Sequence, residues 1–111
     1  MTEVVQPDLL FIAKERSHII TDKNIVEAPD LVAEITSKST KIRDQTTKKA
    51  FYAKHGVKEY WIVYPNKKEI EQFMLHDNKT YKTKSILTQS DTLYSEIISG
   101  FSTALENVFI S

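Results

Sequence analysis

The chain of 111 residues has no cysteine, only two glycines and no long apolar run. Without cysteine it cannot form a disulfide, attack with a thiolate or hold zinc through sulfur, which fits a reducing compartment. Two glycines leave no glycine-rich loop of the kind that holds phosphate in P-loop and dinucleotide-binding proteins. No stretch reaches membrane-spanning length, and the start MTEVVQPD does not lead from a basic segment into an apolar one. We therefore predict a cytoplasmic protein.

What the chain does have is a balanced but unevenly distributed charge. Hydrophobic residues make up 41%, enough for one packed domain, and the net charge is zero. Residues 38–58, however, hold seven basic side chains against Asp44 alone, a net charge of +6. Such a block is usually a solvated helix face, but it is also where a polyanion such as DNA would dock.

The hydrophobic pattern predicts an α/β (α+β) fold with a mixed sheet. A helix from Ser39 or Thr40 to about His55, stopped by Gly56, separates two strand-like runs and favours a parallel crossover connection. Ile42, Thr46, Ala50 and Ala53 are predicted to pack on the sheet, with Lys48 and Tyr52 on another side. The predicted strands are 7–14, 30–37, EYWIVYP, the hairpin EIEQFMLH and KTYKTKSIL, and TLYSEIIS, followed by a short helix over 102–110.

Acidic residues stand within the predicted strand 30–37, where they are unusual. Asp30 and Glu34 share one face of that strand but are roughly 13 Å apart along it, too far to share one ion. Asp8 in strand 7–14 is a better partner for Glu34, because residues facing each other on neighbouring strands are roughly 5 Å apart. Two such carboxylates could hold Mg²⁺ or Mn²⁺.

Two carboxylates, a metal ion and a nearby lysine together suit the hydrolysis of phosphodiesters. The metal polarises the phosphate and acidifies a bound water, and the ammonium group stabilises the water or the charge at phosphorus. The lysine of such sites normally follows the second acid by two residues, but that position is Thr36 here.

Three runs, VVQPDLLFI, APDLVAEITSKST and DQTTKKAFYAKHGVKEYWIVYP, resemble the Uma family of putative restriction-endonuclease-like proteins. The resemblance covers most of the chain from residue 4 and implies the PD-(D/E)xK nuclease fold, with Mg²⁺-dependent cleavage of DNA as the activity. The family's acidic positions fall on Asp8, Asp30 and Glu34, and its helix lysine and tyrosine on Lys48 and Tyr52. The lysine would then come from the helix, which accounts for Thr36.

The resemblance implies a role for each of these residues. Asp8 and Glu34 would bind the metal and, with Lys48, form the catalytic set, while Asp30 and Tyr52 would support it. The basic residues expected to contact the DNA backbone are Lys38, Lys41, Arg43 and Lys49.

The chain also departs from the family pattern. It begins just before Asp8, whereas family members usually carry an N-terminal third, so we expect a single, N-terminally shortened domain over 1–111. Tyr64 replaces a common aspartate, and Lys38 a common proline. A second copy that supplies the missing elements is one expectation, and it makes the protein a homo-oligomer, most simply a dimer.

Plainer interpretations stand beside these. Glu34 could form a simple salt bridge with Lys48 or Lys49, Tyr52 could be a core residue, and Asp30 a hydrogen-bonding residue where its strand begins. At the level of function, the alternatives are a catalytically inactive relative that binds or oligomerises, and a small metal-binding domain that is not a nuclease.

Overall fold

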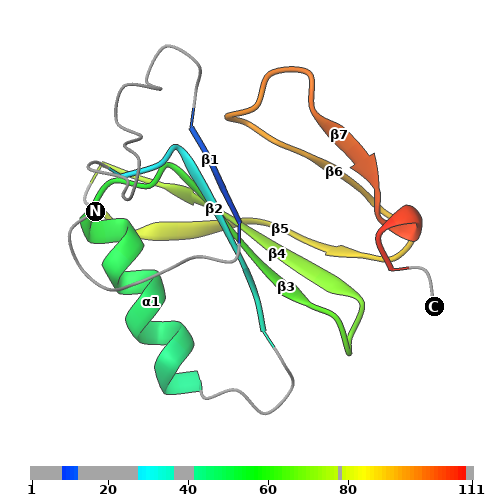
Figure 1. Ribbon diagram of the computed structural model, residues 1–111, viewed down its shortest axis with the longest axis horizontal. Coiled ribbons are helices and arrows are strands. Elements are labelled where there is room, and N and C mark those ends of the chain that lie inside the picture. The colour runs from blue at the N-terminus through cyan, green and yellow to red at the C-terminus, as the bar shows by residue number, and fades with distance from the viewer. Residues whose placement is uncertain (1–8, 13–27, 37–41, 78, 110–111) are drawn as a thin grey trace, which may run out of the picture.

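The computed structural model describes residues 9–12, 28–36, 42–77 and 79–109, which form a five-stranded sheet, one α-helix and a two-stranded sheet (Figure 1). The larger sheet has the order β1-β2-β3-β4-β5, and β6 pairs with β7 in the smaller one. The predicted mixed α+β fold is confirmed. The strands are β1 (Leu9–Phe11), β2 (Leu31–Ile35), β3 (Glu59–Tyr64), β4 (Glu69–Leu75), β5 (Tyr81–Thr88), β6 (Thr92–Tyr94) and β7 (Ser102–Ala104).

The predicted helical crossover joins two parallel strands. α1 (Ile42–Lys54) connects β2 to β3, which pair in parallel from Leu31 with Glu59 onward. The helix ends as predicted at Gly56, whose φ of 83° suits a residue without a side chain. Two hydrogen bonds of 3.1 Å, from Gly56 N–H to Ala53 and from Val57 N–H to Tyr52, close the end in a Schellman arrangement. No helix in the described part of the chain has the length and apolar character of a membrane span.

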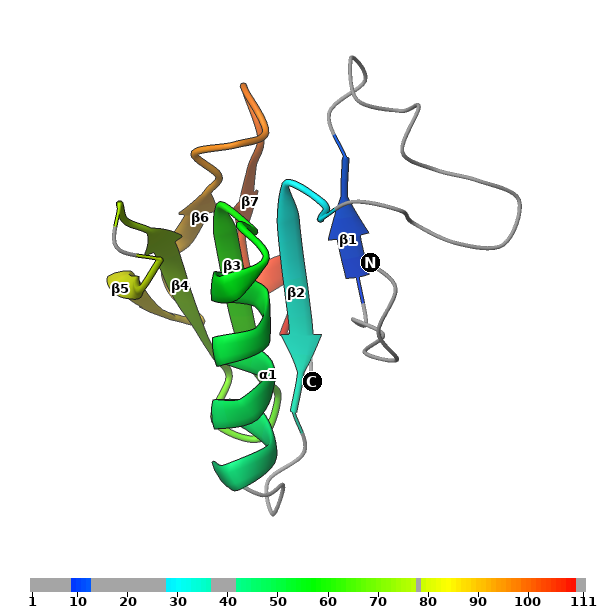
Figure 2. The same cartoon turned by 90° about the vertical axis from the view of Figure 1, so that its left-hand side faces the viewer.

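The two faces of the larger sheet are covered differently. α1 lies over one face, and the β6–β7 hairpin lies on the other side (Figures 1 and 2). Alternation along the strands produces two separate apolar clusters, because successive side chains point to opposite faces. The cluster on the α1 side includes Val32, Tyr52, Val57, Tyr60, Ile62 and Phe73, and the opposite cluster includes Leu31, Ala33, Trp61, Ile70, Leu93, Leu105 and Phe109.

The prediction of which side of α1 packs on the sheet was wrong in part. Tyr52 is completely buried, with its ring centre 5.4 Å from that of Tyr60, whereas Ala50 is exposed. Ala53 is buried as predicted. The large Tyr52 ring gains more from burial than the methyl group of Ala50, which rotates the packed side toward the aromatic residue.

The predicted C-terminal helix is also shorter than expected. Residues Ser102–Ala104 form β7 instead, and the helical part is the single 3₁₀ turn η2 (Leu105–Asn107). The predicted strand TLYSEIIS likewise stops at Tyr94. β6 offers β7 backbone hydrogen-bond partners, with Thr92 opposite Ala104, and this tertiary pairing overrides the local helical pattern.

Candidate active site

The predicted neighbours β1 and β2 do pair, as an antiparallel ladder. Leu9 stands opposite Ala33 and Phe11 opposite Leu31. Leu9 follows Asp8 in the sequence, and Ala33 precedes Glu34. Asp8 itself lies outside the described residues, as do Lys38, Lys41 and the side chain of Arg43.

Glu34 is the fourth residue of β2, and its carboxylate faces α1. Only 6% of the residue is exposed. The Lys48 ammonium lies 3.6 Å from its Oε1, and the Tyr52 hydroxyl donates a 2.5 Å hydrogen bond to its Oε2. That distance is typical of a phenol bound to an ionised carboxylate. A buried carboxylate requires such partners, because leaving it unpaired would be costly.

The helix explains why Lys48 and Tyr52 meet the same carboxylate. Residues four apart lie above one another on one helix face. Alternation along β2 turns Glu34 toward that face, together with the buried Val32. The ion pair of Glu34 with Lys48 is the simple salt bridge that the sequence analysis gave as an alternative. Tyr52 is a core residue, and its hydroxyl also donates a hydrogen bond to Glu34.

The structure shows that Lys48 and Lys49 have different partners, which their spacing in the sequence could not show. Lys49 places its ammonium 4.0 Å from the ring centre of Phe73, a cation–π contact on the side of α1 that faces the sheet. Thr36, where a strand lysine would be usual, is buried, and its backbone N–H binds the Val63 carbonyl at 3.0 Å. Among the described residues, Lys48 is therefore the lysine that reaches Glu34.

Asp30 is buried just before β2 and belongs to the other end of that strand. Its backbone N–H binds the Phe11 carbonyl at 2.8 Å, and its own carbonyl accepts the Glu59 N–H at 3.3 Å. These bonds join β1, β2 and β3 at their ends. Asp30 is thus placed where the interpretation as a strand-start residue put it, roughly 13 Å along an extended chain from Glu34.

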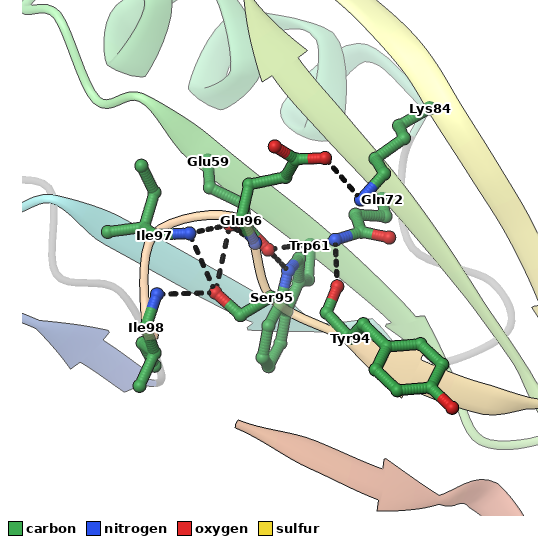
Figure 3. Close-up of polar contacts among 9 residues, drawn as sticks. All are labelled: Glu59, Trp61, Gln72, Lys84, Tyr94, Ser95, Glu96, Ile97 and Ile98. Carbon is green, nitrogen blue, oxygen red and sulfur yellow. Dashed lines mark hydrogen bonds and ion pairs between the residues drawn. The ribbon is translucent and has the colours of Figure 1, made fainter. Parts of the chain in front are cut away.

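A second buried glutamate, Glu59, lies on the opposite face of the sheet, and the sequence pattern assigned it no role. It is fully buried at the start of β3. Its Oε2 accepts hydrogen bonds from the Trp61 indole at 2.5 Å and the Gln72 amide at 2.9 Å (Figure 3). An acid heading the apolar run EYWIVY was the available signal, because a charge there needs a prepared set of donors.

The other oxygen of Glu59 binds the segment that follows β6. Oε1 accepts the Ser95 hydroxyl at 3.0 Å and the backbone N–H groups of Glu96 and Ile97 at 2.9 and 3.0 Å (Figure 3). All five of these donors are uncharged groups. Glu59 therefore fastens the segment after β6 to the sheet, which also explains why the strand ends at Tyr94.

Tyr64, where the family resemblance led us to expect an aspartate, is a neutral donor. Burial raises its pKa, and the neighbouring Glu71 carboxylate raises it further. The hydroxyl donates to Glu71 Oε1 at 3.5 Å, and Thr83 donates to the other oxygen at 3.0 Å. Tyr64 is therefore not a substitute anion for the aspartate.

The described residues contain no group of three or more His, Asp or Glu side chains arranged to hold a metal ion. Of the two carboxylates predicted to hold the metal, the structure describes Glu34, because Asp8 lies outside the described residues. The chemistry of Glu34 suits the expected ion, because Mg²⁺ and Mn²⁺ prefer carboxylate oxygens.

Comparisons with known proteins place the chain in a family. Residues 2–106 match the family described as "Putative restriction endonuclease" (Uma2). The match covers nearly the whole chain, and the chain therefore belongs to this family, as the three sequence runs predicted. No curated protein matches it.

A solved structure shares the fold. It is described as a putative nuclease belonging to DUF820 from Anabaena variabilis ATCC 29413, and it aligns with a TM-score of 0.60 at 18% identity. The alignment covers 75% of this chain and 45% of that one, so this chain spans less than half of its neighbour's length.

Proposed function

We propose that this chain is a metal-dependent endonuclease that hydrolyses DNA phosphodiesters. The observation that carries the proposal is the Glu34 carboxylate, buried on β2 and contacted by Lys48 and Tyr52 from α1. Membership of a family described as putative restriction endonucleases supports the same activity. A buried acid next to a cation is also a common arrangement at functional sites.

The metal would be Mg²⁺ or Mn²⁺, held by Asp8 and Glu34. The pairing of Leu9 with Ala33 supports this assignment, because these residues are the sequence neighbours of the two acids. When bound, the ion would polarise the phosphate and make a bound water more acidic.

Lys48 and Tyr52 would have different tasks beside that ion. The Lys48 ammonium, whose side chain is 34% exposed, can reach solvent and would orient the attacking water or balance charge on the phosphate. The buried Tyr52 hydroxyl would hold the Glu34 carboxylate in one orientation, a positioning task. Asp30 would support the site by tying β2 to its neighbours.

DNA would approach along the basic segment 38–58. Lys38, Lys41, Arg43 and Lys49 would contact backbone phosphates, which gives affinity without sequence preference and a steep dependence on salt. Lys49 would do so from its place above Phe73.

The same contacts favour a second candidate function, binding or assembly without catalysis. In that case the ion pair of Glu34 with Lys48 and the bond from Tyr52 serve only to hold α1 on the sheet. Such a protein would bind DNA as a homodimer but would not cut it. Sedimentation equilibrium measures the assembly, and a nuclease assay separates the two functions.

The decisive assay uses supercoiled plasmid and a labelled duplex with Mg²⁺ or Mn²⁺. Glu34→Gln and Lys48→Met should each lower the cleavage rate at least about 100-fold, the usual loss when a group that stabilises charge in the transition state is removed. Glu71→Gln is the matched control, because Glu71 is also a carboxylate bound by a tyrosine but lies on β4. Cleavage that survives Glu34→Gln, or that falls equally with Glu71→Gln, would refute the assignment.

A further inference from the structure

A hollow of about 540 Å³ lies at one end of the larger sheet, away from the contacts of Glu34. Two turns frame it, one after β3 and one after β5. The residues that line it are Lys67, Lys68, Thr88, Gln89, Ser90 and Glu106. Five of these six side chains are hydrogen-bond donors, and two of the five are cations.

The floor of the hollow is fixed by hydrogen bonds. The Thr88 backbone N–H and hydroxyl bind Asp91 at 2.8 and 3.1 Å, and the Gln89 amide binds the Phe109 carbonyl at 2.7 Å. These bonds hold the turn after β5 against the C-terminal segment. The two lysines thus line the hollow together with a fixed polar surface.

The lysine turn has an unusual backbone. Lys68 has a φ of 56°, a left-handed conformation that residues with a side chain seldom adopt. Hydrogen bonds of 3.2 Å, from Lys67 to Tyr64 and from Lys68 to Pro65, hold the turn in this shape. The backbone of this turn is therefore fixed, which holds the two lysines at a defined place beside the hollow.

The hollow lies at the end of the sheet toward which the Glu34 strand runs. β2 and β3 are parallel, with Glu34 opposite Ile62, so Tyr64 is two residues further along and on the same face. Strand geometry places the Tyr64 Cα roughly 8 Å from that of Glu34. The Lys67 ammonium lies 5.0 Å from the Tyr64 ring centre, which brings the cation over this face.

We propose that this hollow binds a backbone phosphate of the DNA, a short distance along the strand from the bond that is cut. The proposal rests on the proposed nuclease function and adds a second contact point to it. Lys67 and Lys68 would neutralise the phosphate, and the Ser90 hydroxyl and the second N–H of the Gln89 amide would donate hydrogen bonds to its oxygens. Glu106 carries the opposite charge and limits the affinity.

The test measures binding of a fluorescent 20-base-pair duplex by anisotropy, in EDTA and at several salt concentrations. The double variant Lys67→Gln with Lys68→Gln should weaken binding about 10-fold, and the slope of log K against log salt should become shallower by about 1 to 2. Glu106→Gln should strengthen binding, because it removes a repelled charge from the hollow.

The matched control is Lys79→Gln with Lys82→Gln. It removes the same charge, and Lys79 has a φ of 58°, close to that of Lys68, so any backbone strain is matched. Both control residues are exposed and lie at or beside the turn between β4 and β5, at the other end of the sheet. Equal losses in the two double variants, or none in the Lys67 and Lys68 pair, would overturn the proposal.

Cleavage with Mg²⁺ separates this proposal from the one before it. DNA that is bound through the hollow but never cut would refute the nuclease and leave the phosphate site standing. DNA that is cut equally well, and bound equally tightly, by the Lys67 and Lys68 variant would refute the phosphate site alone. Wild-type protein that binds no DNA would refute the phosphate site as well.

Discussion

Two glutamates are buried in this small sheet, one on each face, and they are surrounded by different chemistry. Glu34 faces α1 and is met by a cation and a phenol. Glu59 faces the β6–β7 side and accepts five hydrogen bonds from uncharged donors. Both are almost inaccessible, so burial alone does not distinguish a site from a structural anchor.

The difference lies in what each set of partners is suited to do. Donors to Glu59 come from β3, β4 and the segment after β6, so its carboxylate joins three parts of the chain. Two partners of Glu34, Lys48 and Tyr52, stand one turn apart on α1, and Lys48 is partly exposed. A cation that reaches both a buried acid and solvent can act on a substrate, whereas enclosed neutral donors can only hold the fold together.

The largest expected effect is on stability, at Glu59. Glu59→Ala should lower the free energy of unfolding by about 3 kcal/mol or more, because it leaves the buried Trp61 indole N–H and a buried N–H of the Gln72 amide without their acceptor, at about 1–3 kcal/mol each. Urea denaturation measures this loss. Glu96→Gln, which breaks only the exposed ion pair with Lys84, should cost under about 1 kcal/mol. Similar losses of stability in Glu59→Ala and Glu96→Gln would refute the role of Glu59 as a structural anchor.

The next largest effect on stability is expected at Tyr52, which binds Glu34 on the α1 face of the sheet. Tyr52→Phe keeps the ring but removes the donor to Glu34, and should cost about 1.5–3 kcal/mol, the usual range for a hydrogen bond to a charged group. Cleavage should also fall if the hydroxyl orients the carboxylate. Tyr94→Phe, at an exposed tyrosine, should change stability by less than about 0.5 kcal/mol. Equal stability of the two variants would rule out the Tyr52 bond as a stabilising contact.

High pH should destabilise the fold through the half-buried Tyr81. Burial raises the pKa of Tyr81, which donates a 2.6 Å hydrogen bond to the Val57 carbonyl. Above about pH 10 the unfolded chain loses this proton while the folded chain keeps it. The free energy of unfolding should therefore fall with pH, by up to about 1.4 kcal/mol per pH unit for this group. Urea titrations between pH 9 and 11 measure the slope, and Tyr81→Phe should reduce it; an unchanged slope would contradict this assignment.

The smallest effect on stability is expected at Lys48. Lys48 reaches Glu34 from a partly exposed side chain, and the Tyr52 hydroxyl still binds the carboxylate without it, so Lys48→Met should cost about 1 kcal/mol. Cleavage, in contrast, should be lost. If Lys48→Met unfolded as easily as Glu59→Ala, Lys48 would be a structural residue and not one that acts on a substrate.

The sequence predicted those features that depend on local pattern. β1 and β2 as neighbours, the parallel crossover and the stop at Gly56 follow from strand-like runs and one glycine. The approach of Lys48 to Glu34 was also anticipated, although only the structure separates Lys48 from Lys49.

Features that depend on tertiary contacts could not be predicted from the local sequence pattern. Helical periodicity placed Tyr52 on the side away from the sheet and left its burial in the core as an alternative, because periodicity does not show which side chain gains most from burial. β7 was predicted as helix because the spacing of its apolar residues does not show that it pairs with β6, the preceding strand. Glu59 was passed over because its five donors come from segments up to 38 residues away.

Calorimetric titration of Mn²⁺ into the wild-type protein and into Glu34→Gln, Asp8→Asn and Glu71→Gln tests the proposed metal site. We expect the wild type and Glu71→Gln to bind the ion, and either of the other two changes to abolish binding. Wild-type protein that binds no Mn²⁺, or a Glu34→Gln variant that binds it as tightly as the wild type, would refute a metal site at Asp8 and Glu34.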